Sequence, residues 1–321
     1  MPKIAITDYT FPSLDIEAAI LEPLGGQIAS FKEKRPPAEL IPLVADADQV
    51  ITQFAAVNAE VIQAMQRAKV IVRYGIGVDN VDLDAARARG IPVCNVPDYC
   101  IQEVADHTLG FILGATRQVV TAAQSMRAGD WKLPTPLTGM RTLCDLTVGI
   151  IGFGRIGREV AHRLQAFRGR VLVFDPVVPS TQIEAAGASP VSLDDLFAQS
   201  DIVTLHCPST AQTRGMIGRE ALARMKSGVI LINVARGDLV DPDALTDALQ
   251  RGQVSGAALD VFSPEPIPVD HPIRRMDQVI LSAHIASASV RAVRRLRETV
   301  AQITAMSIRG ETLPNIVNGL R

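Results

Sequence analysis

The chain has 321 residues, of which 47% are hydrophobic, 21% charged and 4% aromatic, and its formal net charge is -2. This length predicts two domains of ordinary size, and the near-neutral charge gives no electrostatic reason to expect nucleic acid or an anionic membrane as a partner. The four cysteines form no C-x-x-C pair, no residue pattern indicates a metal site, and no signal peptide or membrane-spanning apolar run is found, so we expect a reduced, cytoplasmic protein.

The first third of the sequence alternates short β-rich runs with helical patterns. Strands are predicted at Ile4–Thr7, Val50–Thr52, Val70–Tyr74 and Pro92–Asn95, and helices at Leu14–Leu24 and Asp82–Arg89. Because strands that alternate with helices form parallel βαβ units, this part predicts an α/β domain.

A long helical pattern then runs from Val104 to Arg127. It is more apolar than a surface helix needs to be. The following segment, Trp131–Pro136, contains two prolines and predicts an irregular connection.

The most specific motif follows an apolar run that begins at Val148. The run leads into G-x-G-x-x-G at Gly152, Gly154 and Gly157, and the next apolar run ends at Asp175, 18 residues after Gly157. In a dinucleotide site the three glycines permit a tight turn, a close approach of backbone to pyrophosphate and close helix packing, and a carboxylate about 20 residues on binds ribose. The alternative is a glycine-rich turn without a ligand.

The strand rhythm continues to the end of the second half. Strands are predicted at Val148–Gly152, Val171–Asp175, Ile202–His206, Val229–Val234, Ala257–Val261 and Val279–Ser282. Together with the helices between them they predict a doubly wound parallel sheet. A last helix is predicted at Ser289–Ile308, and its charge run of Arg291, Arg294, Arg295 and Arg297 is interpreted as a solvated face or as ion-pair partners.

Three polar residues follow the last three predicted strands, namely Arg236, Glu265 and His284. Because open α/β sheets bind ligands at the carboxyl ends of their strands, we expect a cation, a carboxylate and an imidazole at one edge. That set would suit hydride chemistry, in which the protein holds an anionic substrate and moves one proton. Taken singly, each residue has an ordinary alternative as a surface or structural residue.

Over essentially its whole length the chain resembles the D-isomer-specific 2-hydroxyacid dehydrogenase family. Four segments carry the resemblance: Arg73–Asn80, Gly152–Arg158, Asn233–Gly237 and Asp260–His284. Within the family, Asn95–Cys100 and Glu103–Thr108 look most like the C-terminal-binding-protein-like branch.

The resemblance implies two doubly wound parallel-sheet domains. A Rossmann NAD-binding domain, residues 101–286, would be inserted into a flavodoxin-like substrate domain made of residues 1–100 and 287–321, with the active site in the cleft. Asp175 favours NAD over NADP, because its carboxylate would accept from ribose hydroxyls and repel a 2′-phosphate.

The resemblance also implies roles for the polar residues. Arg236 would hold the substrate carboxylate and carbonyl oxygen, and His284 would exchange a proton with that oxygen. Glu265 would stabilise the imidazolium form of His284. Backbone N–H groups of Tyr74, Gly75, Ile76 and Gly77 would bind the remaining carboxylate lone pairs.

The cofactor-binding residues implied by the resemblance lie along the whole second half and in the turn before it. They are Ile76, Thr108, Gly152, Gly154, Arg155, Ile156, Gly157, Asp175, His206, Cys207, Pro208, Thr213, Val234, Ala235, Arg236, Asp260, His284, Ala286 and Ser287.

The predicted function is an NAD-dependent oxidoreductase that interconverts a small D-2-hydroxy acid and its 2-oxo acid, such as a glyoxylate or hydroxypyruvate reductase. The predicted assembly is a homodimer formed through the region of Val104–Arg127, as in the family. One alternative is an NAD(H)-sensing, peptide-docking corepressor-like dimer, against which the lack of long extensions weighs. Another is a family member that binds NAD without turnover.

Overall fold

The computed structural model describes residues 1–133 and 136–320, and these divide into two compact units. One unit contains Met1–Tyr99 and Ser289–Arg321, and the other contains Cys100–Ala288. The sequence predicts boundaries at 100/101 and 286/287. Among the described residues, no helix is both long enough and apolar enough to cross a membrane.

The first unit is built on a parallel sheet with the strand order β2-β1-β3-β4-β5, which is the flavodoxin-like order. Its strands are β1 (Lys3–Ile6), β2 (Gln27–Ser30), β3 (Gln49–Thr52), β4 (Ile71–Arg73) and β5 (Val93–Cys94). Its helices are α1 (Asp15–Leu21), α2 (Pro37–Val44), α3 (Ala59–Ala64), α4 (Leu83–Ala88) and α12 (Val290–Arg309).

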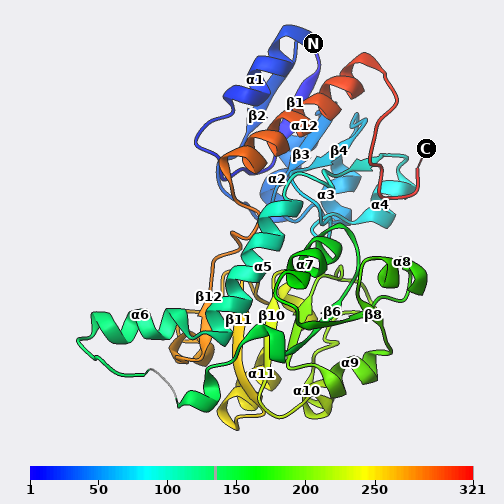
Figure 1. Ribbon diagram of the computed structural model, residues 1–321. Helices are drawn as coiled ribbons and strands as arrows, with labels where there is room; N and C mark the ends of the chain where they lie inside the picture. Colours follow the sequence, from blue (N-terminus) through cyan, green and yellow to red (C-terminus); the bar gives the residue numbers. More distant parts are fainter. Residues whose placement is uncertain (134–135, 321) are drawn as a thin grey trace. The chain divides into compact units, whose positions relative to one another are not determined.

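Alternation along the strands divides the core of this unit between the two faces of its sheet. Ile4 and Ile6 of β1 pack with residues of α1 and α12, whereas Ala5 packs with residues of α2 and α3. In Figure 1 the first helix, α1, and the last helix of the chain, α12, lie side by side on one face. The two ends of the sequence therefore share one hydrophobic core.

The second unit is a parallel sheet with the order β12-β11-β10-β9-β6-β7-β8, a Rossmann order extended by one strand. Its strands are β6 (Thr147–Ile151), β7 (Arg170–Phe174), β8 (Ser189–Pro190), β9 (Ile202–Leu205), β10 (Val229–Asn233), β11 (Val254–Leu259) and β12 (Val279–Leu281). Its helices are α5 (Ile101–Thr116), α6 (Val119–Arg127), α7 (Arg155–Gln165), α8 (Ser180–Ala185), α9 (Leu193–Gln199), α10 (Arg219–Arg224) and α11 (Pro242–Gln250). The predicted fold class, two parallel-sheet α/β domains, is confirmed.

One predicted helix is wrong. The pattern at Val104–Arg127 forms two helices, because the backbone of Gln118 adopts a left-handed conformation with φ of 55° and ends the run. The Gln118 side chain donates to the carbonyl of Ala115 at 2.7 Å and so satisfies an acceptor in the last turn of α5. Of the predicted irregular connection at Trp131–Pro136, residues 134 and 135 lie outside the described part of the chain.

Candidate active site

The three glycines of the G-x-G-x-x-G motif differ in the space that a Cβ would have at each position. Gly152 has a φ of 96°, and a Cβ there would lie 2.6 Å from the backbone nitrogen of Cys207. A Cβ on Gly157 would lie 2.1 Å from the carbonyl oxygen of Gly152. Around Gly154, by contrast, a Cβ would meet no described atom within 4 Å. The protein's own packing therefore requires Gly152 and Gly157, and leaves space beside Gly154 for a ligand.

The same turn leads directly into α7, whose N-cap is Gly154 and whose first residues are Arg155 and Ile156. An eleven-residue helix presents unsatisfied backbone N–H groups and the positive end of its dipole at this point. This arrangement can bind the phosphates of a dinucleotide.

Asp175 follows β7 directly and faces the glycine turn. Its carboxylate accepts from the backbone N–H of Phe153 at 2.7 Å and from those of Val177 and Val178 at 2.8 and 3.0 Å. Desolvation is the largest effect on this group and acts to raise its pKa, but the three N–H donors and Arg158 together lower the pKa of Asp175. The carboxylate is thus ionised and held beside the turn, as a ribose ligand would need to be.

The loop after β9 carries His206, Cys207, Pro208 and Thr213. The His206 ring contacts the Thr204 hydroxyl at 3.0 Å, and burial lowers the pKa of His206 to about 3, so the ring is neutral. Burial likewise raises the pKa of Cys207 to about 11, which leaves an unreactive thiol. Thr213 donates to the carbonyl of Pro208 at 2.6 Å and so closes the loop.

Thr108, a further predicted cofactor residue, is fully buried in α5, where its hydroxyl donates to the carbonyl of Val104 at 2.7 Å. Val234 and Ala235 form the start of the loop after β10. Ala286 and Ser287 lie just beyond His284 in the loop after β12.

The structure brings the predicted acid and its carboxylate partner into contact. His284 Nδ1 lies 2.9 Å from Glu265 Oε2, and Glu265 Oε1 accepts from the backbone N–H of Phe262 at 2.8 Å. Desolvation acts most strongly and would raise the pKa of Glu265, but the hydrogen bond and charge of His284, with smaller effects from Phe262 and Arg236, lower it. The carboxylate is therefore ionised beside the imidazole at neutral pH.

The loop that carries Arg236 is fixed from both sides. The Asn233 side chain donates to the carbonyl of Arg236 at 2.8 Å and accepts from the N–H of Ala235 at 3.0 Å. Beside them, a Cβ on Gly237 would lie 1.9 Å from the carbonyl carbon of Phe262. Only glycine lets the loop after β10 pack this closely against the loop that bears Glu265.

Asp260 holds the backbone on which His284 stands. Its fully buried carboxylate accepts from the N–H groups of Ile285 and Ala286, both at 2.8 Å, and from the Ser282 hydroxyl. His284 itself has a left-handed backbone with φ of 53°. These bonds on both sides of His284 fix that conformation.

Two contributors to this arrangement were not predicted from the sequence. Ser282 bridges Asp260 to His107 of α5, whose Nε2 lies 3.2 Å from the Ser282 hydroxyl. The position of Ser282, two residues before His284, is a weak sequence signal that Ser282 belongs to the site. No sequence signal indicates His107, because it is more than 150 residues away from His284 in the chain.

In the first unit the predicted substrate turn follows β4. A Cβ on Gly75, which has a φ of 145°, would lie 1.5 Å from Arg73 Nη1. The N–H groups of Tyr74 and Gly75 donate to the carbonyls of Thr52 and Arg73. Within the described residues, no acceptor is found for the N–H of Ile76 or Gly77. Of the four N–H groups predicted to bind an anion, these two can therefore donate to a ligand.

Among the described residues, no group of three or more His, Cys, Asp or Glu side chains is arranged to hold a metal ion.

Comparison with known proteins assigns the second unit. Residues 109–286 match the sequence profile described as the NAD binding domain of D-isomer specific 2-hydroxyacid dehydrogenases. The NAD prediction is therefore confirmed at the level of the domain.

Similar proteins cover nearly the whole chain. D-3-phosphoglycerate dehydrogenase of Mycobacterium leprae is 41% identical over 281 residues, 87% of this chain but only 53% of that protein, so the chain spans about half its length. Glyoxylate reductase of Korarchaeum cryptofilum is 38% identical over 294 residues, 90% of this chain and 88% of that protein. The crystal structure of D-lactate dehydrogenase from Aquifex aeolicus, complexed with NAD and lactic acid, has a TM-score of 0.87 at 31% identity, covering 98% of this chain and 99% of that chain. The predicted branch within the family stays a prediction.

The contrast between Gly154 and Gly157 can be tested by two alanine substitutions. Gly157→Ala should lower the free energy of unfolding by about 1–3 kcal/mol, because its Cβ meets backbone. Gly154→Ala should lower the free energy of unfolding by less than about 1 kcal/mol, the cost of alanine at an N-cap, and weaken NADH binding by about tenfold, because its Cβ enters the space left for the ligand. Thermal unfolding and NADH fluorescence titration measure the two effects, and unchanged NADH affinity in Gly154→Ala would contradict this assignment.

The Glu265–His284 pair predicts a pH effect. The pKa of Glu265 lies below its usual value of 4.5, so the stabilisation from its ionised form is complete above that value and is lost as pH falls through the lowered pKa. As the pH falls through this range, the wild type should therefore lose more of its free energy of unfolding than Glu265→Gln, and denaturant unfolding between about pH 6 and pH 3 measures the difference. An equal loss in both proteins would show that the ionised Glu265 contributes no stability. Glu298→Gln, on α12, is the control for the general loss of a carboxylate.

Proposed function

Because the chain belongs to the D-isomer specific 2-hydroxyacid dehydrogenase family, we propose that it is an NAD-dependent oxidoreductase that interconverts a small D-2-hydroxy acid and its 2-oxo acid. The observation that carries the proposal is the Glu265–His284 hydrogen bond of 2.9 Å, beside the loop that holds Arg236. An ionised carboxylate paired with an imidazole supplies a proton donor, and the guanidinium supplies a binding group for an anion.

The proposed roles follow from the chemistry of these groups. Bound NAD would supply the hydride chemistry. Arg236 orients the substrate through its carboxylate and carbonyl oxygen, since its planar donors suit bidentate binding. In reduction His284 donates a proton to the carbonyl oxygen, and in oxidation it removes the hydroxyl proton. The free N–H groups of Ile76 and Gly77 donate to the substrate carboxylate.

The proposed substrate class is the small 2-oxo acids, such as glyoxylate and hydroxypyruvate. Support comes from the glyoxylate reductase of Korarchaeum cryptofilum, which this chain matches over 88% of that protein's length. The phosphoglycerate dehydrogenase relative makes a phosphorylated acid the natural comparison substrate.

A panel of 2-oxo acids assayed with NADH tests the proposed function. Glyoxylate, hydroxypyruvate, pyruvate, a longer acid and a phosphorylated acid should be compared by kcat/KM, and at least one small acid should be reduced. His284→Ala should lower kcat/KM by about 10²–10⁴-fold, because general acid catalysis is lost.

His271→Ala is the matched control, since His271 lies in the same unit but caps the turn at Ile273 through its own ring. Full activity of His284→Ala would disprove the assigned role. NADH binding by the wild type without turnover of any acid would favour the NAD(H)-sensing protein instead.

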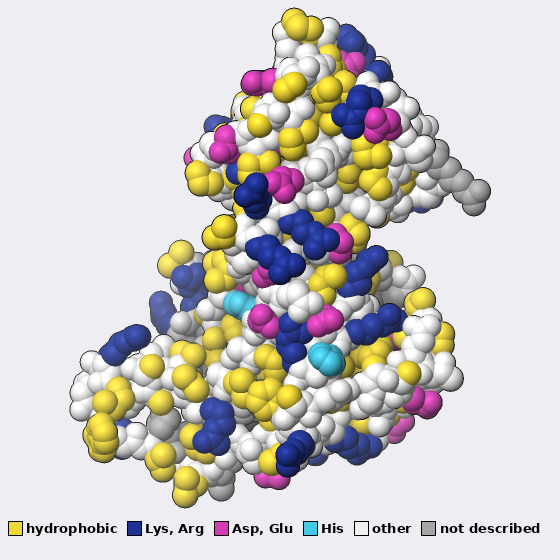
Figure 2. All heavy atoms as spheres, turned by 45° about the horizontal axis from the view of Figure 1, so that its top comes forward, with side chains coloured by type: hydrophobic (Ala, Val, Ile, Leu, Met, Phe, Trp, Pro, Cys, Tyr) yellow, Lys and Arg dark blue, Asp and Glu magenta, His cyan; other side chains and the backbone are white. Residues whose placement is uncertain are grey.

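We also propose a homodimer formed through the segment around α6. No residue of α6 is buried, although several of its side chains are apolar. Val119, Val120 and Met126 are exposed by 56, 37 and 51%, and Trp131 nearby is exposed by 90%. Figure 2 shows hydrophobic side chains at the lower left, where this segment projects from its own unit. Apolar residues gathered on a projecting segment favour burial against a symmetry-related copy.

Light scattering tests the dimer. The wild type should have twice the mass of one chain, and Val120→Asp combined with Met126→Asp should shift it to the monomer, because charges would be buried in the interface. Val290→Asp, at a residue exposed by 91% on α12, should leave the mass unchanged. A monomeric wild type at micromolar concentration would contradict the proposal.

A further inference from the structure

A buried polar network lies directly beneath the turn that carries Ile76 and Gly77. Tyr74, the residue before Gly75, is only 1% exposed, and its hydroxyl donates to Glu17 Oε1 at 2.9 Å. Burial, followed by the charge of Glu17, raises the pKa of Tyr74 well above its usual value, so the hydroxyl stays a donor. The Tyr74 side chain therefore faces the core of the first unit and does not line a substrate pocket.

Glu17 is held by an arginine from the other end of the chain. Glu17 is fully buried and Arg297 of α12 is 6% exposed. Arg297 Nε lies 3.0 Å from Glu17 Oε1, and its Nη2 lies 2.6 Å from Glu17 Oε2. This bidentate ion pair fixes the carboxylate in direction as well as in position.

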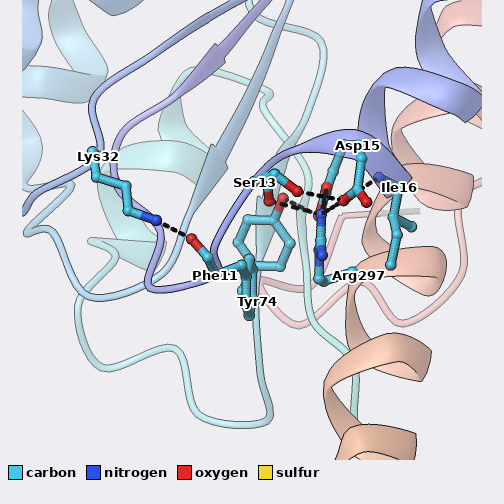
Figure 3. A network of polar contacts seen from close by, with 8 residues as sticks. Phe11, Ser13, Asp15, Ile16, Lys32, Tyr74 and Arg297 are labelled. Carbon is cyan, nitrogen blue, oxygen red and sulfur yellow. Dashed lines mark hydrogen bonds and ion pairs between the residues drawn. The ribbon is translucent and has the colours of Figure 1, made fainter.

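Arg297 is in turn fixed by the loop before α1 and by the first residue of α1 (Figure 3). Its Nη2 donates to the carbonyl of Ser13 and to Asp15 Oδ1, each at 2.8 Å. The ring of Phe11 lies 5.0 Å from the guanidinium carbon and packs edge-on against Tyr74 with centroids 5.2 Å apart. The Ser13 hydroxyl and then Arg297 lower the pKa of Asp15 to about 2, so the anionic side of the network stays charged.

The turn is held from its other side by backbone bonds. The carbonyl of Gly75 accepts from the N–H of Val96 at 3.0 Å, and the carbonyl of Ile76 accepts from the Asn95 side chain at 2.6 Å. These bonds fix the carbonyls of the turn, whereas the Tyr74 side chain fixes the residue at which the turn begins. The direction of the two unengaged N–H groups depends on both.

We propose that Arg297 and Glu17 are positioning residues that act through the Tyr74 hydroxyl to aim the N–H groups of Ile76 and Gly77 at the substrate carboxylate. The proposal rests on the oxidoreductase function proposed above. Neither Arg297 nor Glu17 touches the substrate. Their effect is to hold the backbone of the turn in place. Backbone N–H groups cannot reorient as side chains can, so a small displacement of the turn strongly weakens binding of the substrate carboxylate.

Two substitutions test the chain of contacts. Tyr74→Phe removes one hydroxyl and keeps the ring, and should raise KM for the 2-oxo acid by about three- to tenfold, the effect of one hydrogen bond, with little change in kcat or in NADH affinity. Arg297→Lys keeps the charge but loses the bidentate pair, and should raise the same KM by about tenfold or more. The double variant should be no worse than Arg297→Lys alone, because both changes break one chain of contacts.

Arg294→Gln is the matched control. Arg294 lies on the same helix, exposed, in an ion pair with Glu298 at 2.7 Å, and its loss should change none of these parameters. A merely structural network would lower thermal stability in Arg297→Lys while KM stayed at the wild-type value, and that result would overturn the proposal.

Hydrogen exchange separates this proposal from the proposed function. In the free protein, the amides of Tyr74, Gly75 and Val96 should exchange about three- to tenfold faster in Tyr74→Phe than in the wild type, since they report local opening of the turn. Unchanged exchange would overturn the positioning role whatever the enzyme reduces. Faster exchange with no turnover by the wild type would instead support the positioning role and reject the proposed function.

Discussion

The candidate catalytic groups depend on the register of three neighbouring parallel strands. Asn233 of β10 pairs with Leu259 of β11, and Leu259 pairs with Leu281 of β12, so the three strands end in one row. Three separate loops then deliver Arg236, Glu265 and His284 to the same edge of the sheet. A slip of one residue would move a strand end by about 3.3 Å, more than a hydrogen bond tolerates, so the contact of 2.9 Å between Glu265 and His284 requires this register.

Register places His284 at the edge, and Asp260 sets its direction. A left-handed backbone costs a residue with a Cβ about 1–2 kcal/mol. Contacts with Asp260, 24 residues earlier in the chain, offset that cost at His284. The Asp260 carboxylate does so by accepting from the next two N–H groups, while the carbonyl of Asp260 accepts from the N–H of His284 itself at 2.8 Å. The buried carboxylate is therefore part of the scaffold of the site.

Secondary structure could be predicted from the sequence wherever a local hydrophobic pattern determines it. Strands are predicted at Val229–Val234, Ala257–Val261 and Val279–Ser282, because buried parallel strands are mostly apolar, and the structure has strands there that end at Asn233, Leu259 and Leu281. The edge strands β2 and β8 escaped prediction, since Gln27–Ser30 and Ser189–Pro190 are short and exposed and have little hydrophobic signal. The left-handed Gln118 also escaped, because the apolar spacing continues across it while the backbone does not.

Long-range polar contacts were beyond such patterns. Arg297 looked like one member of a charged run, and its neighbours Arg294 and Arg295 do form exposed ion pairs with Glu298 and Asp98. Its partner Glu17 lies 280 residues away, and only the packing of α12 against α1 brings the two together. Local charge patterns cannot distinguish an arginine on a solvated face from one buried in an ion pair.

The two carboxylates that matter to the proposed chemistry lie in opposite environments, and their tasks explain the difference. Glu265 is about one third exposed, so the solvent can relax around it when the charge of its imidazole partner changes. Glu17 is fully buried between an arginine and a tyrosine, where a change of charge would cost far more. A buried ion pair adds little net stability over an apolar pair of the same shape, but it has a direction that an apolar pair lacks. An apolar residue at position 17 could fill the space, yet it could not bind the Tyr74 hydroxyl and hold the turn above it.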